Sequence, residues 1–286
     1  MKLKSQFFHS LVFMLLLSGT FFVCTATVRA SAFMLSEGQH MYTTGFTYST
    51  ANEWFDQNRN RVAQGCTSSD YSWNHSYTYG YSYYNNFFAN TSLVHQSCGA
   101  GKVTGLGDAQ LGVRGRLDNT RNGRTWEIAL NIPTGYDNQK INRLGYGRFG
   151  VWAGLAWSTQ NTGWEEKMPS YWEFGTGMNY WFGAPSSQSR SYVKWSWRLD
   201  ENGDNRIVLQ GTLKLSLRDG RAEFPVAFAG FPRYSGDYDA GVLAAKYSRR
   251  LTEQWTVSVG AGNTVWGRKT SASWYGNLSF TYRWDS

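Results

Sequence analysis

From about residue 38 onward, apolar and polar side chains alternate along the chain with a period of two. Residues 124–135 read RTWEIALNIPTG, and every second side chain is apolar: Trp126, Ile128, Leu130 and Ile132. The same pattern recurs in three further segments, residues 192–199, 207–218 and 271–284. Successive side chains of a β-strand point to opposite faces, so this period predicts strands. No segment after the N-terminal region predicts a helix.

The number and length of these strands indicate the fold class. The pattern gives about twelve candidate strands, most of about 9 to 16 residues. Strands of soluble sandwiches usually have about 5 or 6 residues, whereas a tilted membrane strand needs about 9 to 11. The chain is therefore predicted to be all-β, a transmembrane antiparallel β-barrel of about twelve strands. In hydrocarbon every backbone N–H and C=O needs a partner, so such a sheet must close on itself.

The connections between strands predict the orientation of the barrel. Tight turns are expected at residues 119–123, 201–205 and 252–254. Longer loops are expected at residues 57–69, 138–145 and 220–235. If the chain starts in the periplasm, the tight turns lie at the periplasmic end and these longer loops lie outside, as in outer-membrane barrels.

Residues 71–83 read YSWNHSYTYGYSY, with an aromatic residue or His at every second position. A core in water prefers Val, Leu and Ile inside and charge outside, and this segment has neither. We expect a wall strand whose aromatic row faces lipid, because Tyr and Trp suit the boundary between lipid and water. Two alternatives stay open: part of the row projects above the membrane, or the row lines the interior.

Composition supports a membrane protein. Among 286 residues, aromatics and charged residues each make up 17%, and the charged share is below the usual quarter. Disordered chains lack aromatics and carry excess charge, so that class is excluded. The sequence pI is about 9.3, yet the basic residues alternate with apolar ones in strands instead of clustering on a helix. Nucleic acid is therefore not an expected partner, whereas anionic lipopolysaccharide is.

The N-terminus has the features of a secretory signal. Lys2 and Lys4 precede a largely apolar run, residues 7–23, and Ala30-Ser31-Ala32 forms an A-x-A cleavage site. Residues 1–32 are therefore predicted to be a signal peptide, and residues 33–286 the barrel domain. Cleavage removes three basic residues, so the net charge falls from +8 to +8 − 3 = +5.

Cleavage also leaves two cysteines, Cys66 and Cys98. An even pair in an exported chain suggests one disulfide. Cys66 falls in the expected first outer loop and Cys98 at the start of the second, so the bond would tie two surface loops together. No H-E-x-x-H, C-x-x-C or P-loop motif occurs, and neither a metal nor a cofactor is expected.

The polar face of the strands is assigned to the barrel interior. Its acidic residues are few: Asp108, Glu127 and Glu173. Its basic residues are more numerous, and an excess of positive charge favours anionic solutes. The candidate selectivity residues are Arg114, Arg116, Lys194, Arg198, Lys214 and Lys246, and Arg218, Arg250 and Arg283 share their face. Alternatively, these charges pair or are solvated inside a plugged barrel and have no role in transport.

Two motifs carry a resemblance to a known family. Residues 105–114 read GLGDAQLGVR, and residues 130–135 read LNIPTG. The pair resembles the G-x-G-D strand opening and L-x-x-P-T-G strand ending of transporter-like outer-membrane barrels, one branch of which is assigned to a phenol-degradation pathway. The closing YRW at residues 282–284 is also similar. The resemblance implies passage or binding of small, often hydrophobic or aromatic, compounds at the outer membrane.

One residue pair suggests an enzyme. His95 and Ser97 are two apart, so they share a strand face, and Glu127 could orient the imidazole as in a barrel lipid hydrolase. This H-x-S spacing is common by chance, and we expect no catalytic residues.

The sequence as a whole predicts a passive outer-membrane channel of a Gram-negative bacterium for a small hydrophobic, aromatic or anionic solute. Its other expected partners are outer-membrane lipid and the assembly machinery. The alternatives are a structural or surface-interaction barrel without transport and a secreted carbohydrate-binding β-sandwich.

Overall fold

The computed structural model describes residues 32–99, 101–117, 123–134, 147–159, 170–183, 186–217 and 237–286. These residues form one sheet of 13 strands. The strands are β1 (Gln39–Phe55), β2 (Arg61–Gly80), β3 (Asn85–Cys98), β4 (Gly101–Leu106), β5 (Ala109–Arg116), β6 (Arg124–Ile132), β7 (Gly150–Ser158), β8 (Tyr171–Trp181), β9 (Gln188–Arg198), β10 (Asn205–Ser216), β11 (Asp239–Arg250), β12 (Trp255–Arg268) and β13 (Thr270–Asp285). In this part of the chain, no helix has the length and apolarity needed to cross a membrane.

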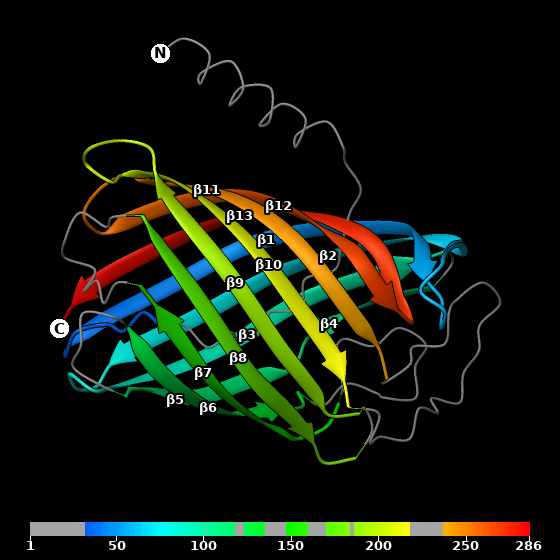
Figure 1. Ribbon diagram of the computed structural model, residues 1–286, viewed down its shortest axis with the longest axis horizontal. Coiled ribbons are helices and arrows are strands. Elements are labelled where there is room, and N and C mark those ends of the chain that lie inside the picture. The colour runs from blue at the N-terminus through cyan, green and yellow to red at the C-terminus, as the bar shows by residue number, and fades with distance from the viewer. Residues whose placement is uncertain are drawn as a thin grey trace, which may run out of the picture.

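The sheet closes into a barrel. Its order is β2-β1-β13-β12-β11-β10-β9-β8-β7-β6-β5-β3-β4, and a further pairing of β2 with β3 joins the two ends. β4 and β5 pair with different parts of β3, residues 93–98 and 85–90. They share one position in the wall, which makes the structure a closed antiparallel barrel of twelve strands. The predicted fold class is confirmed (Figure 1).

The outer face of the wall is apolar and the inner face is polar. On β6, Ile128 and Leu130 are 52% and 53% exposed, whereas Glu127 and Ala129 are buried at 0% and 2%. A protein that folds in water buries its large apolar residues and solvates its carboxylates. The reversed arrangement matches a wall whose outside touches lipid.

The aromatic row on β2 faces outward. Tyr71, Trp73 and Tyr77 are exposed, whereas Ser72 and Thr78, on the alternate positions of the strand, are buried. The polar atoms of the row are bonded to the neighbouring strand β1: Tyr42 Oη lies 2.6 Å from His75 Nδ1, and Trp73 Nε1 donates to Thr44 Oγ1 at 2.7 Å. The expectation of an outward row therefore holds, and a row that lines the interior is wrong.

Both termini of the barrel lie at one end, which we call the near end. The start of β1 pairs with the end of β13, as Gln39 with Asp285 (Figure 1). The turns at residues 199–204 and 251–254 are tight, as predicted, and connect strands at the near end. The predicted loops 138–145 and 220–235, most of the turn 119–123, residues 1–31 and Arg218 lie outside the described residues.

The predicted long loop at residues 57–69 is wrong. The chain turns between Phe55 and Arg61, and β2 begins at Arg61. The Asp56 carboxylate accepts from the backbone N–H groups of Asn58 and Asn60 at 2.7 and 2.8 Å, which stabilises a short turn. The polar residues that follow belong to a strand that begins at the far end of the barrel and runs back to the near end.

Cys66 and Cys98 form the predicted disulfide, with their Cα atoms 5.6 Å apart. The expected location in surface loops needs correction, because Cys66 lies within β2 and Cys98 ends β3. Cys66 shares the face of the buried Ser72 and Thr78, which is the inner face. The bond therefore joins two adjacent wall strands near the far end.

Candidate functional site in the barrel lumen

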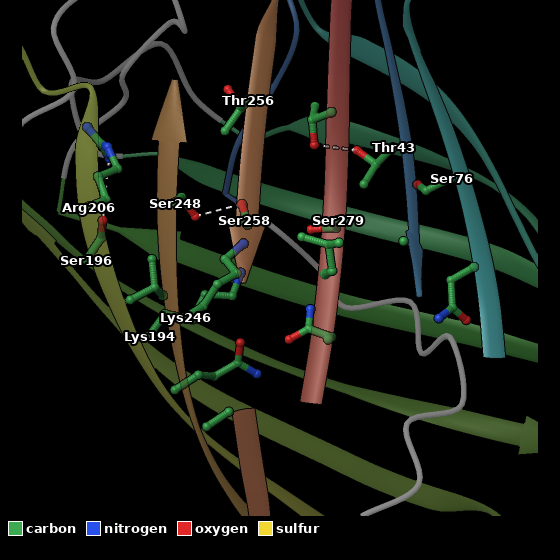
Figure 2. Close-up of a pocket in the computed structure, with 18 of the residues that line it drawn as sticks. Thr43, Ser76, Lys194, Ser196, Arg206, Lys246, Ser248, Thr256, Ser258 and Ser279 are labelled. Atoms are coloured by element: carbon green, nitrogen blue, oxygen red, sulfur yellow. Dashed lines mark hydrogen bonds between the residues drawn. The ribbon is translucent and has the colours of Figure 1, made fainter. Parts of the chain in front are cut away.

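The lumen contains a cavity of about 610 Å³. Inward-facing residues from most strands of the wall line it, so the cavity belongs to the whole barrel and not to one loop. Figure 2 shows part of its lining, with Arg206, Lys194 and Lys246 on neighbouring strands and the hydroxyl groups of other strands beside them.

Arg114 lies in an ion pair at one side of the cavity. It is placed on the inner face of β5 directly opposite Glu127 on β6. Its Nη2 and Nε atoms donate to Glu127 Oε2 at 2.6 and 2.9 Å, and the indole Nε1 of Trp152 donates to Oε1 at 2.9 Å. A buried carboxylate requires such partners, since desolvation is costly for an unpaired charge. The Arg114 charge is therefore compensated by a carboxylate of the neighbouring wall strand.

Lys194 forms a second pair of the same kind. Glu173 on β8 lies opposite Lys194 on β9, and Lys194 Nζ donates to Glu173 Oε1 at 2.6 Å. The hydroxyl of Tyr192 donates to the same oxygen at 2.5 Å. Glu173 is fully buried, and the Lys194 side chain is 17% exposed. Arg114 and Lys194 therefore line the cavity with their charges already compensated.

Three further cations line the cavity near its near end: Arg206, Lys246 and Arg250. Arg250 Nε donates to Asp204 Oδ1 at 2.7 Å. Arg206 donates to Ser196 Oγ and to the Gly203 carbonyl, both at 3.4 Å. The sequence interpretation missed Arg206, because it started the alternation at Ile207. Arg206 is an even number of residues from Gln210 and Lys214, so it shares their face of the strand. Extending the alternating pattern by one residue would have predicted that Arg206 faces the lumen.

The rest of the cavity wall combines hydroxyl and amide groups with aromatic and aliphatic residues such as Phe88, Tyr275 and Val208. Ser258 Oγ donates to Ser248 Oγ at 2.8 Å, and Thr43 Oγ1 lies 3.0 Å from Thr281 Oγ1. Further lining residues of this type are Ser76, Asn90, Asn277 and Ser279. Such groups both donate and accept hydrogen bonds, so they can exchange partners with water or with a solute.

An N-terminal segment, residues 32–37, lies inside the barrel. Arg114 Nη1 donates to the Phe33 carbonyl at 3.4 Å, and the Phe33 ring packs edge-on against Tyr171 at 5.0 Å between centroids. The Asn86 amide, oriented to satisfy both its groups, bonds the backbone of Leu35 at 2.7 and 3.2 Å. A Cβ on Gly80 would meet the Ser36 carbonyl oxygen, so only glycine permits this approach. The segment narrows the lumen at the near end, and no sequence pattern indicated this.

The remaining predicted selectivity residues lie outside the cavity lining. Arg116 stacks over the ring of Tyr83 at 4.4 Å, in a turn at the near end. Arg198 is exposed at the near end of β9. Lys214 Nζ donates to Tyr238 Oη at 3.2 Å toward the far end. Of the six residues, the structure therefore brings only Arg114, Lys194 and Lys246 to the cavity.

The residues of the possible hydrolase are not brought together. His95 Nδ1 lies 2.6 Å from Thr104 Oγ1, and Ser97 Oγ donates to the Ser69 carbonyl at 3.1 Å. Both are on the outer face of β3, whereas Glu127 points inward from β6. Within the described ranges, no group of three or more His, Cys, Asp or Glu residues could hold a metal ion.

Comparison with known proteins gives structural likeness alone. No family model and no curated protein sequence matches the chain. The COG4313 outer membrane channel from Pseudomonas putida F1 matches with a TM-score of 0.67 at 12% identity, covering 92% of this chain and 100% of that one. The chain has the fold of outer-membrane β-barrels. The translocator domain of the autotransporter NalP from Neisseria meningitidis matches with a TM-score of 0.50 at 11% identity, covering 87% and 89%.

Proposed function

We propose that this protein is a passive channel for small hydrophilic solutes across the outer membrane, without a chemical step. The observation that carries the proposal is a cavity of about 610 Å³, lined in part by charged and hydroxyl side chains, inside a closed wall whose outer face is apolar. A protein needs such an interior to offer water and solutes a path through hydrocarbon. The near end, with both termini and the turns at residues 199–204 and 251–254, faces the periplasm in this proposal.

The cavity lining favours a hydrophilic solute over the hydrophobic or aromatic compounds that the resemblance implies. Ion pairs and hydroxyl groups lie in the wall beside aromatic and aliphatic side chains such as Phe88 and Val208. A hydrophobic solute would remove the water of these polar groups without replacing the lost hydrogen bonds. The proposed partner of the folding chain is the outer-membrane assembly machinery. The proposed partner of the membrane-embedded barrel is lipopolysaccharide.

Single-channel recording in planar lipid bilayers tests the proposal. We expect the purified protein to give discrete current steps in potassium chloride. Phe33→Ala should raise the conductance, because it removes a ring from the N-terminal segment inside the lumen. Phe87→Ala is the matched control, since Phe87 faces outward on β3 and is 45% exposed.

Two results would contradict the channel. A heat-modifiable, folded barrel that conducts no ions would favour a structural or surface-interaction barrel. An equal rise in conductance for the Phe33 and Phe87 variants would mean that current leaks around the protein and does not pass through the lumen.

A further inference from the structure

Three inward side chains of β13 lie flat against the wall of the cavity. Tyr275, Asn277 and Ser279 occupy alternate positions of this strand, and all three line the cavity. Each lies over a glycine of a neighbouring strand, where an added Cβ would come within 2.9 Å of it. Only glycine permits this close approach. These glycines are Gly262, Gly260 and Gly45. We call Tyr275, Asn277 and Ser279 the β13 shelf.

The amide of Asn277 and the hydroxyl of Ser279 can bond to a solute. Both side chains are half-buried, and within the part of the chain that the structure describes neither has a hydrogen-bond partner. Asn74 on β2 lies beside them, because Gly45 on β1 pairs with both Asn74 and Ser279. The Asn74 amide donates to two hydroxyl groups at 3.1 and 3.3 Å, and its Oδ1 has no partner. Donors and acceptors for solute hydroxyls are therefore present on both sides of Gly45.

The wall around the β13 shelf carries hydroxyl groups and no acidic or basic side chain. Figure 2 shows Ser279 between Ser258 and Thr43. Among the described cavity-lining residues of β12, β13, β1 and β2, none is Asp, Glu, Lys or Arg. Lys246 lies two strands away from Asn277, opposite Gly260. An ion on the shelf would lose its water without an opposite charge beside it, so the shelf favours a neutral solute.

The Tyr275 ring adds an apolar surface to these polar groups. A pyranose sugar has hydroxyl groups around its rim and C–H groups on its faces, so it needs surfaces of both kinds. Side chains two residues apart in a strand are about 6.6 Å apart, which is close to the width of one sugar ring. A ring on Tyr275 would therefore bring its hydroxyls to Asn277, and a second ring would reach Ser279.

We propose that Tyr275, Asn277, Ser279 and Asn74 form a binding site for a neutral sugar of one or two pyranose rings. The inference rests on the proposed channel function and names the class of solute for it. The C–H face of the sugar contacts Tyr275, and its hydroxyls bond to Asn277 and Ser279. Another hydroxyl donates to Asn74 Oδ1 once that amide turns toward the cavity. The cavity of about 610 Å³ lies within the usual range of small-molecule sites, about 300 to 1,000 Å³.

Equilibrium binding and current block test the site separately. Isothermal titration calorimetry measures binding to the folded barrel in a detergent without a sugar headgroup, and planar bilayers in potassium chloride measure block. We expect maltose to bind most tightly and glucose next. Sorbitol, which has the hydroxyls of glucose without its ring, should bind least.

Variants locate the binding. Asn277→Ala should raise the dissociation constant of maltose about tenfold, because hydrogen bonds to the sugar are lost. Ser279→Ala should raise it about threefold, and it decides the matter if Asn277→Ala does not fold. Asn90→Ala is the matched control, since it removes the same carboxamide from the cavity lining on β3.

The outcomes separate the site from the channel. Maltose binding to a folded barrel that carries no current refutes the channel and supports the site. A normal current without maltose binding or block refutes the site and leaves the channel. Equal binding of sorbitol and glucose refutes recognition of the ring, and tighter binding of glucuronate than of glucose refutes a neutral solute. An equal loss in Asn90→Ala and Asn277→Ala shows a general property of the lumen and overturns the site.

Discussion

The two halves of the lumen wall use different chemistry. On β3–β11, which we call the charged half, fully buried carboxylates are fixed by cations and aromatic donors, as Glu127 is by Arg114 and Trp152. On β12, β13, β1 and β2, the hydroxyl half, none of the cavity-lining residues that the structure describes is Asp, Glu, Lys or Arg. Short side chains such as Ser258 and Thr43 bond to their neighbours there.

Because of this difference, one part of the lumen wall is rigid and the other can adapt to a solute. An ion pair with a buried partner is costly to break, so the charged half holds a fixed shape. Neutral hydroxyl pairs are weaker and exchange readily with water, so the hydroxyl half can adapt to a solute. The halves meet at two junctions, β2 with β3 and β11 with β12, and each carries a cross-link: a disulfide at the first and a salt bridge at the second.

The largest effect is expected in the charged half. Glu127→Gln should lower the free energy of unfolding by about 4 kcal/mol, because it leaves the Arg114 charge without its buried partner. The midpoint of urea unfolding, followed by heat-modifiable gel migration, measures the change. An unchanged midpoint would mean that the pair contributes nothing to rigidity, and the contrast between the halves would fail.

The second largest effect on stability is expected at the junction of β2 with β3, which carries the disulfide. Cys98→Ser should lower the free energy of unfolding by about 3 kcal/mol, since the cross-link no longer restricts the unfolded chain. The same unfolding assay measures it, and wild-type protein treated with reductant is the control. Reductant could lower the stability of wild type while Cys98→Ser stays as stable as oxidised wild type. In that case the stability lost on reduction does not come from this disulfide.

The salt-bridge junction should give a pH-dependent effect. Hydrogen bonding from Arg268, at 2.8 and 3.2 Å, holds the pKa of Asp237 below its usual value. The pKa is lower in the folded state, so the stabilisation is present above about pH 3.9 and is lost as the pH falls through the folded-state pKa. Asp237→Asn should lower the free energy of unfolding by about 2 kcal/mol at neutral pH. Stability curves of variant and wild type should converge in acid; parallel curves would contradict the prediction.

The smallest effect is expected in the hydroxyl half. Ser258→Ala removes the bond to Ser248 and should cost about 1 kcal/mol, because a neutral hydrogen bond contributes little net stability. The urea midpoint checks this value. A loss as large as that of Glu127→Gln would show that the two halves do not differ in rigidity.

Much of the wall could be predicted from the sequence, because the direction of a side chain in an extended strand is a local property. The alternation placed Ile128 and Leu130 outside and Glu127 inside, and each lies there. The alternation failed where the local signal was weak. Polar residues after Asp56 suggested a loop where β2 begins, and the limits drawn around one apolar run excluded Arg206.

By itself, the sequence determined the strand period, the approximate number of strands and the identity of the inner and outer faces, since these depend on neighbouring residues and on the solvent that each face meets. The tertiary structure alone decided which charges pair, as Glu173 with Lys194, and that residues 32–37 enter the lumen. Those features depend on register between strands and on closure of the sheet, which joins Gln39 to Asp285 from opposite ends of the described chain. Hydrogen bonding between such distant segments leaves no periodic trace in the sequence, because many registers satisfy the same alternation.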